Sequence, residues 1–369
     1  MKILVATDKF KGSLTASQVC DSVKGALFDV DPQFEIHNIP LADGGEGSLE
    51  ALSQSGDRVV ECIVSDPLMR KVKSSYLVRQ NGIAVIEMAS SVGLARLLES
   101  EYNPEKTSSY GFGEMIVHAY HTQGVRKFIL TIGGSATSDC GIGMLSAMGL
   151  TFQDANGVDL PPIGGSLCEI SKISYSKAFG LIRQCNFTVA TDVDNPLLGK
   201  NGAAHFYAPQ KGADSSMVER LEKGGVSFVN LINKDRCEDV GSILGGGAAG
   251  GVGMALRIFL SAKMLSGADF IIEYRDVEKF IEWCDVVITG EGKVDRQTLN
   301  GKLVWRIISL AKKHNKRCVV ICGALQEGIN NKTLGVDAIY SLVREGVTSE
   351  MAIADAERYI HDVILKNFI

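Results

Sequence analysis

Five times along this chain, an apolar run typical of a buried β-strand is followed at once by glycines with acidic or hydroxyl residues beside them. The five segments are DKFKGS (8–13), ADGGEG (42–47), GGSATSDCG (133–141), TDVDNP (191–196) and TGEGKVD (289–295). A strand that runs into a loop and then a helix predicts parallel strands in an α/β fold. Ligands of open parallel sheets bind beyond the carboxyl ends of the strands, so we expect these segments to gather at a binding site.

The order of the patterns along the chain predicts two domains. Strand, loop and helix alternate in the first 56 residues and again from residue 285, whereas short alternating runs begin near residue 58, with a hairpin turn at Asn81-Gly82. We interpret ADFIIEY (268–274) as the strand that closes this middle region. The predicted architecture is a discontinuous α/β/α domain of residues 1–62 and 276–369, into which residues 63–275 are inserted as a second α/β domain.

Charge and cysteine usage exclude several kinds of partner. The formal net charge is −5 and Lys and Arg form no run, so we expect neither nucleic acid nor an anionic membrane surface as a partner. The nine cysteines are scattered without a Cys-x-x-Cys pair, which is typical of reduced thiols in a cytosolic protein. The sequence has no signal-peptide pattern and no apolar stretch of membrane-spanning length, so we predict a cytoplasmic protein with a small-molecule partner.

The residue types in the five segments suit phosphoryl transfer. That reaction needs N–H donors for phosphate oxygens, cations, carboxylates that hold Mg²⁺, and a carboxylate that accepts the proton of the attacking hydroxyl. The candidate cations are Lys11, Lys211 and Lys293. The candidate carboxylates are Asp8, Asp43, Glu46, Asp192, Asp194, Glu291 and Asp295.

Each segment also has a purely structural interpretation. Ser13, Ser138 and Asp139 suit helix N-caps, and ADGGEG suits a tight connection. GGSAT (133–137) points more clearly to a ligand, because its small residues leave backbone amides unshielded ahead of a helix whose dipole favours an anion. TGEGKVD is polar and glycine-rich directly after an apolar strand pattern, which favours a functional loop.

Motifs of other enzyme classes are weak or missing. GGGAAG (245–250) satisfies Gly-x-Gly-x-x-Gly and Asp269 follows at a suitable distance, but no convincing buried strand precedes the glycines. The Gly-Lys pairs at 292/293 and 301/302 lack the earlier glycine of a phosphate-binding P-loop. No Gly-x-Ser-x-Gly motif occurs, and His118 and His121 fit a helix face better than a metal site.

Taken together and in this order, ten segments of the chain resemble the glycerate kinase family of the bacterial glycerate 2-kinase type. They are FKGS (10–13), PLADGGEG (40–47), DPL (66–68), SYG (109–111), GGSATSD (133–139), DVDNPLLG (192–199), PQKGA (209–213), GAAGG (247–251), TGEGKVDRQT (289–298) and GK (301–302). The resemblance implies a flavodoxin-like (Rossmann-like) α/β/α domain that carries an inserted second α/β domain. It also implies a kinase that converts ATP and D-glycerate to ADP and 2-phospho-D-glycerate with Mg²⁺.

Our hypothesis assigns roles to these residues in a site between the two domains. Lys11 and the GGSAT amides would hold phosphates, and Asp43 and Asp192 would serve Mg²⁺ and the acceptor hydroxyl, one of the two as general base. The further candidates are Asp8 for catalysis, Glu291, Lys293 and Asp295 for the nucleotide or metal, and Ser13, Lys211 and Asp194 for the substrate. The loop residues concerned in nucleotide binding are Gly133, Gly134, Ser135, Ala136 and Thr137. Among these, Lys211 is the candidate for the carboxylate of glycerate.

Two other functions stay open at this point. A nicotinamide-dependent hydroxy-acid dehydrogenase would use the Gly-x-Gly-x-x-Gly segment, and a non-catalytic sensor would bind a sugar acid without turnover. The oligomeric state is open between a monomer and a homodimer.

Overall fold

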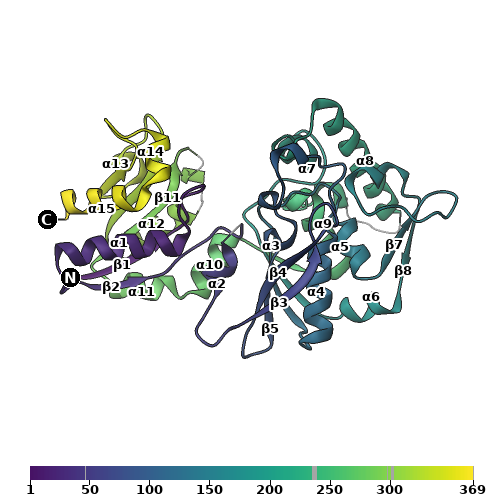
Figure 1. Ribbon diagram of the computed structural model, residues 1–369, viewed down its shortest axis with the longest axis horizontal. Coiled ribbons are helices and arrows are strands. Elements are labelled where there is room, and N and C mark those ends of the chain that lie inside the picture. Colours follow the sequence, from purple (N-terminus) through teal and green to yellow (C-terminus); the bar gives the residue numbers. More distant parts are fainter. Residues whose placement is uncertain (46, 235–238, 297, 301–302, 369) are drawn as a thin grey trace. The chain divides into compact units, whose positions relative to one another are not determined.

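The structure is a computed structural model that describes residues 1–368, except Glu46, 235–238, Gln297, Gly301 and Lys302. The chain divides into two compact units, the first formed by Met1–Leu52 and Gly267–Ile369 and the second by Ser53–Ser266 (Figure 1). Both units combine sheets with helices, which confirms the predicted α/β class. No helix in the described part of the chain is long and apolar enough to cross a membrane.

In its described residues, the first unit contains a five-stranded parallel sheet with the strand order β13-β12-β11-β1-β2. Its strands are β1 (Lys2–Thr7), β2 (Glu35–Asn38), β11 (Val286–Val294), β12 (Arg317–Leu325) and β13 (Ala338–Ser341). Counted within the unit, this is the order 2-1-3-4-5 of flavodoxin-like folds. The predicted fold of this unit is therefore confirmed.

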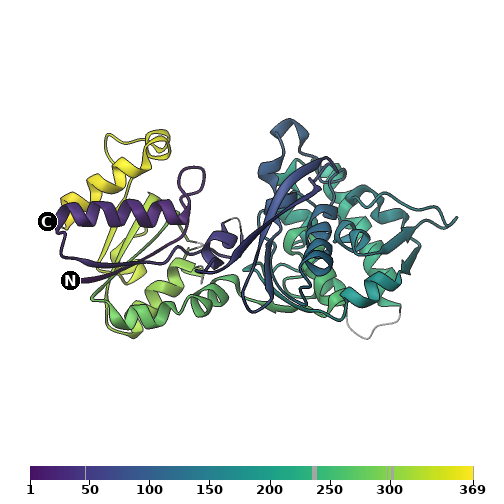
Figure 2. The same ribbon diagram turned by 60° about the horizontal axis from the view of Figure 1, so that its bottom comes forward.

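Helices cover both faces of this sheet. On one face, α1 (Ala16–Val30) and α15 (Ala356–Asn367) pack on alternate residues of β1 and β11, among them Ile3, Val5 and Ile288. Figure 2 shows these two helices on one side of the sheet and α10 (Gly267–Tyr274), α11 (Val277–Trp283) and α12 (Leu303–Lys313) on the other. The shorter helices of the unit are α2 (Ser48–Leu52), α13 (Asn331–Leu334) and α14 (Ser349–Ala354).

Helix α1 illustrates why the sequence folds in this way. Its buried residues recur at the three- and four-residue spacing of one helix face, from Ala16 to Leu27. Thr15 caps its first turn, because the Thr15 hydroxyl accepts from the Gln18 amide and the Gln18 side chain accepts from the Thr15 amide. The helix therefore begins with a capping box.

The described residues of the second unit form a six-stranded sheet with the order β10-β9-β6-β5-β4-β3, in which β10, β9, β6 and β5 are parallel and β4 and β3 antiparallel to their neighbours. The strands are β3 (Arg58–Ser65), β4 (Lys71–Val78), β5 (Ile83–Glu87), β6 (Lys127–Thr131), β9 (Asn186–Ala190) and β10 (Lys263–Leu265). Gly82 has a φ of +76° in the tight turn from β4 to β5, which confirms the predicted hairpin.

Seven α-helices and a small two-stranded sheet surround this sheet in the described residues of the second unit. The helices are α3 (Ala89–Val92), α4 (Tyr110–Thr122), α5 (Ile142–Ala147), α6 (Lys177–Ile182), α7 (Ala203–Tyr207), α8 (Ser215–Asn233) and α9 (Val252–Leu260), and the small sheet pairs β7 (Leu150–Gln153) with β8 (Lys172–Tyr175) in antiparallel orientation. One apolar core runs through the unit, with Phe128 and Phe187 stacked at 4.9 Å between ring centroids.

The segment ADFIIEY was predicted as a strand and is a helix, α10. Its buried residues are Ala268, Ile271 and Ile272, which is the spacing of a helix face and not of a strand. Asp269 therefore lies in the first turn of a helix, where it forms an ion pair of 3.2 Å with Arg306 of α12.

The predicted domain boundaries, at 62/63 and 275/276, lie ten and nine residues beyond those of the compact units. The first predicted boundary cuts β3, which pairs with β4 from Arg58 to Ser65 as one strand. The second predicted boundary leaves α10 in the inserted domain. Gly267, the first residue of α10, packs so closely on Asp43 that an added Cβ would lie 2.4 Å from the Asp43 carbonyl oxygen. The contacts of α10 with α12 and with this segment assign α10 to the first unit.

Candidate functional site

The carboxyl ends of the parallel strands in the first unit meet at one edge of the sheet. Asp8 directly follows β1, and its amide donates to the Gly290 carbonyl of β11 at 2.9 Å. β1 and β11 flank the point where the strand order reverses, which is the usual ligand position in such sheets. Asp43 follows β2, and its Oδ1 accepts from the Gly45 amide at 3.1 Å. The edge therefore brings two of the predicted catalytic carboxylates onto neighbouring strands.

A pocket of about 270 Å³ lies beside Asp8 at this edge. Its lining is the 8–16 segment together with Leu41, Gly47 and Glu50. The side chain of Lys11 is exposed, whereas the Ser13 hydroxyl donates to the Ile353 carbonyl at 2.7 Å and so ties the loop to α14. Lys11 is thus available to an anion, and Ser13 has a structural bond.

TGEGKVD was predicted as a loop and is the carboxyl half of β11. Lys293 and Val294 still pair with β12, opposite Ala324 and Leu325. Glycine permits this extension, because a Cβ at Gly290 would lie 1.9 Å from the Ile321 carbonyl oxygen and one at Gly292 would lie 2.9 Å from the Lys11 amide. The glycine pattern thus reflects close packing of the strand on β12 and on the 8–13 loop.

The predicted nucleotide ligands of β11 lie at the same edge. The Glu291 carboxylate accepts from the Thr298 hydroxyl at 2.7 Å, and the Asp295 amide donates to the same hydroxyl at 3.0 Å. Lys293 is exposed. Glu46 and the Gly301-Lys302 pair, which the sequence also suggested, lie outside the described residues.

The second unit gathers the remaining predicted residues at the carboxyl edge of its own sheet. GGSAT follows β6, Asp192 and Asp194 follow β9, and Ser266 follows β10, all on neighbouring parallel strands. The Ser266 hydroxyl donates to Asp192 Oδ1 at 2.9 Å, and both Asp192 and Asp194 are exposed. The predicted site residues thus fall into two sets, one in each unit.

The GGSAT loop is held by bonds to its carbonyl groups and by one of its amides. The Gly134 carbonyl accepts from the Leu94 amide at 2.9 Å, and the Ala136 amide donates to the Val92 carbonyl at 3.0 Å. The Ala136 carbonyl accepts from the buried Thr107 hydroxyl at 3.0 Å. Gly134 has a φ of +71° and is exposed, so the loop is open to solvent at this end.

Lys211 lies beneath this loop with only 3% of its surface exposed. Its Nζ donates to the Thr137 carbonyl at 2.6 Å and to the Ser135 hydroxyl at 3.3 Å. Burial lowers the pKa of Lys211 to about 8, although the field of Asp139 acts in the opposite direction. Sequence reasoning proposed Lys211 as a substrate ligand but had no signal for its contact with GGSAT, which joins residues 76 positions apart.

Asp139 has the structural role that the sequence allowed. It is fully buried, and its carboxylate accepts from the Gly141 and Gly143 amides at the start of α5 and from the Ser109 amide and hydroxyl, at 2.7 to 3.1 Å. Burial raises the pKa of Asp139, while these hydrogen bonds act to lower it. Ser109, which belongs to the SYG segment, and Thr107, which sequence reasoning missed, thus fix the GGSATSD segment from the side.

The Gly-x-Gly-x-x-Gly segment serves packing in this structure. A 3-10 helix, Val240–Ser242, and not a strand, precedes it, so it does not form a dinucleotide-binding turn. Gly250 has a φ of +66°, and an added Cβ would lie 2.1 Å from the Thr137 carbonyl oxygen. The Cys140 amide donates to the Gly250 carbonyl at 2.9 Å. The segment therefore supports the GGSAT loop.

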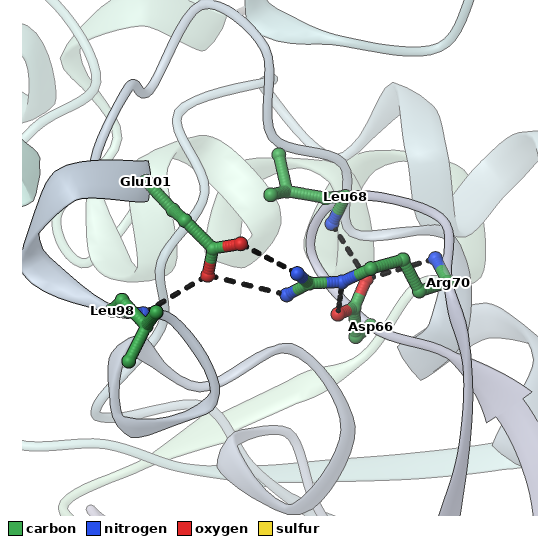
Figure 3. Close-up of polar contacts among 5 residues, drawn as sticks. All are labelled: Asp66, Leu68, Arg70, Leu98 and Glu101. Atoms are coloured by element: carbon green, nitrogen blue, oxygen red, sulfur yellow. Dashed lines mark hydrogen bonds and ion pairs between the residues drawn. The ribbon is translucent and has the colours of Figure 1, made fainter.

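The DPL segment forms the turn between β3 and β4, and Figure 3 shows how it is fixed. Asp66 accepts from the Leu68 and Arg70 amides at 2.8 and 2.9 Å and from Arg70 Nε at 2.5 Å. The same guanidinium donates to Glu101, which also accepts from the Leu98 amide at 3.0 Å. Because Arg70 donates to both carboxylates, its guanidinium links the turn of Asp66 to the segment of Glu101.

The carboxylates fit a magnesium ion that is shared with phosphate oxygens. Mg²⁺ prefers oxygen ligands and is usually bound by one or two carboxylates together with substrate phosphates. Among the residues that the structure describes, no group of three or more His, Cys, Asp or Glu side chains forms a metal cage. In the second unit the exposed carboxylate of Asp192 suits this arrangement, and in the first unit the carboxylate of Asp43 is a donor of the same type.

Fold and site together define a two-unit α/β protein whose loops at the carboxyl ends of parallel strands have the position of a ligand site in such sheets. Comparison with known proteins then specifies the family. A model described as "Glycerate kinase family" matches residues 3–367. The chain belongs to the glycerate kinase family.

Named relatives cover nearly the whole chain. Glycerate 2-kinase of Escherichia coli (strain K12) is 37% identical over 99% of this chain and 96% of its own length. Glycerate kinase of Halalkalibacterium halodurans is 39% identical over 92% of this chain and 90% of its own length. A crystal structure described as a glycerate kinase 2 from Salmonella typhimurium LT2 matches with a TM-score of 0.82 and 37% identity, over 99% of this chain and 95% of the other.

Proposed function

We propose that this protein transfers the γ-phosphoryl group of ATP to D-glycerate and forms 2-phospho-D-glycerate and ADP, with Mg²⁺ as the metal. The observation that carries the proposal is the match to glycerate kinases along almost the entire chain, including a relative named glycerate 2-kinase. The open, glycine-lined loop and the carboxylates at strand ends support it, because phosphoryl transfer depends on positioning and on charge stabilisation.

The GGSAT loop and Lys11 are our candidates for binding phosphate. Gly133 and Gly134 have no Cβ to shield their amides, so the backbone can approach phosphate oxygens closely. The exposed ammonium of Lys11 can follow a mobile phosphate oxygen. Glu291, Lys293 and Asp295 are further candidates for the nucleotide.

Asp192 and Asp43 are our candidates for the metal and the acceptor hydroxyl, with Asp8 as a third catalytic carboxylate. Mg²⁺, when bound, would neutralise charge on the phosphate oxygens. One aspartate would accept the proton of the glycerate hydroxyl, which requires only hydrogen-bond reach to that hydroxyl in the complex. Asp194 and Ser13 are proposed for glycerate binding. The earlier prediction that both units act on the same pair of substrates stays a prediction.

The decisive experiment measures ADP release with D-glycerate, L-glycerate, D-lactate and glycolate as acceptors. The proposal requires D-glycerate to give the highest kcat/KM in the presence of MgATP. Phosphorus NMR of the product, compared with authentic 2- and 3-phosphoglycerate, identifies the hydroxyl that reacts. A 3-phosphorylated product would contradict the position, and no ADP release with any acceptor would contradict the kinase assignment.

Thermal shift separates the two other functions considered. MgATP should raise the melting temperature of a kinase, and NAD that of a dehydrogenase, since a ligand stabilises the state that binds it. The position of the Gly-x-Gly-x-x-Gly segment after a 3-10 helix weighs against the dehydrogenase. Stabilisation by D-glycerate without any ADP release would favour the sensor.

A further inference from the structure

The carbonyl groups of the GGSAT loop are held by donors from three separate segments. The Leu94 amide bonds the Gly134 carbonyl, the Thr107 hydroxyl bonds the Ala136 carbonyl, and the Lys211 ammonium bonds the Thr137 carbonyl. Lys211 makes the shortest of these bonds, at 2.6 Å. Each bond fixes the orientation of one peptide plane.

A fixed carbonyl also fixes the direction of the next amide. In a planar trans peptide, the N–H points opposite to the C=O. The amides of Ser135, Thr137 and Ser138 therefore point away from the donors that hold the preceding carbonyls. Within the described residues, none of these three amides has a hydrogen-bond acceptor. Thr137 and Ser138 are successive residues with unpaired amides among the described residues, and anion-binding nests are built from such successive amides.

Two hydroxyl groups in the same loop also lack partners. Thr137 Oγ1 and Ser138 Oγ are buried, and neither has a hydrogen-bond partner among the residues that the structure describes. Buried polar groups are nearly always satisfied in folded proteins, so these two mark a place where a ligand or bound water completes the hydrogen bonding.

Burial of the Lys211 ammonium costs folding stability. In the described part of the chain, no carboxylate lies within 4 Å of its Nζ, and its recorded bonds go only to an uncharged carbonyl and a hydroxyl. An ammonium in such surroundings lowers the stability of the fold. A functional role would explain why a lysine occupies this position. Its position beneath the loop also leaves it buried away from the solvent that reaches the loop at Gly134.

We propose that Lys211 is a positioning residue for nucleotide phosphate and not a ligand of the glycerate carboxylate. By holding the Thr137 carbonyl beneath the loop, its ammonium directs the following amide toward the anion and adds positive charge behind the nest. This inference rests on the proposed kinase function, because it names the residue that prepares the phosphate loop of that same enzyme.

The test compares the steady-state kinetics of the wild type and Lys211→Met. Met has a similar length but neither charge nor donor. KM for MgATP should rise about 10- to 100-fold, the effect of losing a charged hydrogen bond, while KM for D-glycerate changes less than about threefold. Lys106→Met, which removes an exposed charge next to Thr107, should leave both values unchanged. A selective rise in KM for D-glycerate, or no change in either KM, would overturn the proposal.

Thr107→Val provides a second variant that keeps all charges. It removes the donor to the Ala136 carbonyl, so KM for MgATP should rise about 3- to 10-fold without a change in KM for D-glycerate. If Lys211→Met does not fold, this variant decides whether the loop carbonyls set nucleotide affinity. An unchanged KM for MgATP in Thr107→Val would then contradict the inference.

The pH dependence of MgATP binding separates positioning from general structural support. Deprotonation of Lys211 begins near its pKa of about 8, so wild-type affinity should fall as pH rises above 8. The affinity of Lys211→Met for MgATP should not show this decrease above pH 8. Asp139, the carboxylate whose field reaches Lys211, is present in both proteins and cancels in the comparison. An equal fall in both would overturn the inference. Isothermal titration calorimetry measures the affinity for MgATP without any turnover. It therefore tests the role of Lys211 in the GGSAT loop even if D-glycerate is not the acceptor.

Discussion

At the scale of single residues, Lys211 and Asp192 represent opposite environments for a charged group. The ammonium of Lys211 is buried and bonded to neutral oxygens, whereas the carboxylate of Asp192 is exposed and bonded to the Ser266 hydroxyl. Removing the first charge changes folding stability as well as the contribution proposed for Lys211 in the GGSAT loop. Removing the second leaves the core untouched, so its effect tests the catalytic role proposed for Asp192.

The buried ammonium makes folding stability depend on pH in a predictable direction. Its pKa is about 8 in the folded protein and near 10.5 when unfolded, so the unfolded chain binds the extra proton between these values. The unfolding free energy of the wild type should therefore rise relative to that of Lys211→Met by about 3 kcal/mol from pH 8 to pH 10.5. Denaturant titrations of both proteins at several pH values measure this difference. A constant difference would contradict the burial of a charged amine.

Asp192→Asn tests the carboxylate at the end of β9. We expect kcat to fall at least ~100-fold, because a neutral amide neither accepts the hydroxyl proton nor holds a metal ion well. The melting temperature should stay within about 1 °C of the wild type because the residue is exposed. Asp159→Asn, an exposed aspartate beyond β7, serves as the control for loss of one negative charge. Unchanged turnover in Asp192→Asn would remove this residue from the reaction.

At the scale of elements, glycines decide how closely loops and strands approach one another. Gly250 lies against the Thr137 carbonyl and Gly292 against the Lys11 amide, so both sit where the proposed phosphate-binding loops are shaped. In the sequence these glycines belong to motifs that suggest ligand binding. In the structure they allow close packing between segments.

Gly250→Ala should displace the GGSAT loop. The added Cβ would lie 2.1 Å from the Thr137 carbonyl oxygen, so the loop or α9 has to move. Gly157→Ala is a matched control, since Gly157 has a comparable φ of +80° but no atom within 4 Å of the added Cβ. The control should lose about 1 kcal/mol of stability from backbone strain, and Gly250→Ala at least about 2 kcal/mol more, with weaker MgATP binding. Equal losses in chemical denaturation would show that the close contact is unimportant.

The elements also show how far the sequence predicts this molecule. Alternation of apolar runs with glycine-acid segments predicted the parallel strands and placed Asp8, Asp43 and Asp192 at their carboxyl ends, because that pattern is local. ADFIIEY failed because a short apolar run suits a strand and a helix alike. The Lys211 contact with Thr137 was not predictable, since it depends on how two distant segments fold back on one another.

At the scale of the whole molecule, each unit has a core of its own. Among the residues that the structure describes, the main core of the second unit lies between Val60 and Met264, and that of the first unit draws on residues from both of its chain segments. A core that is complete within one continuous segment predicts independent folding.

A fragment of residues 53–266 should therefore fold without the rest of the chain. We expect a cooperative thermal transition and the far-ultraviolet circular dichroism of a mixed α/β protein. A fragment of residues 1–52 lacks β11, the strand beside β1, and should stay unfolded under the same conditions. A 53–266 fragment without a cooperative transition would show that its core needs the other unit.

The central place of β1, hydrogen-bonded to β2 on one side and to β11 on the other, has a consequence for biosynthesis. β1 leaves the ribosome well before its partner β11, because the whole second unit, Ser53–Ser266, is translated between them. The inserted unit can reach its native state during this interval, whereas the exposed edge of β1 has to wait. Chaperone binding to nascent chains should accordingly concentrate on the first 52 residues and end once β11 emerges.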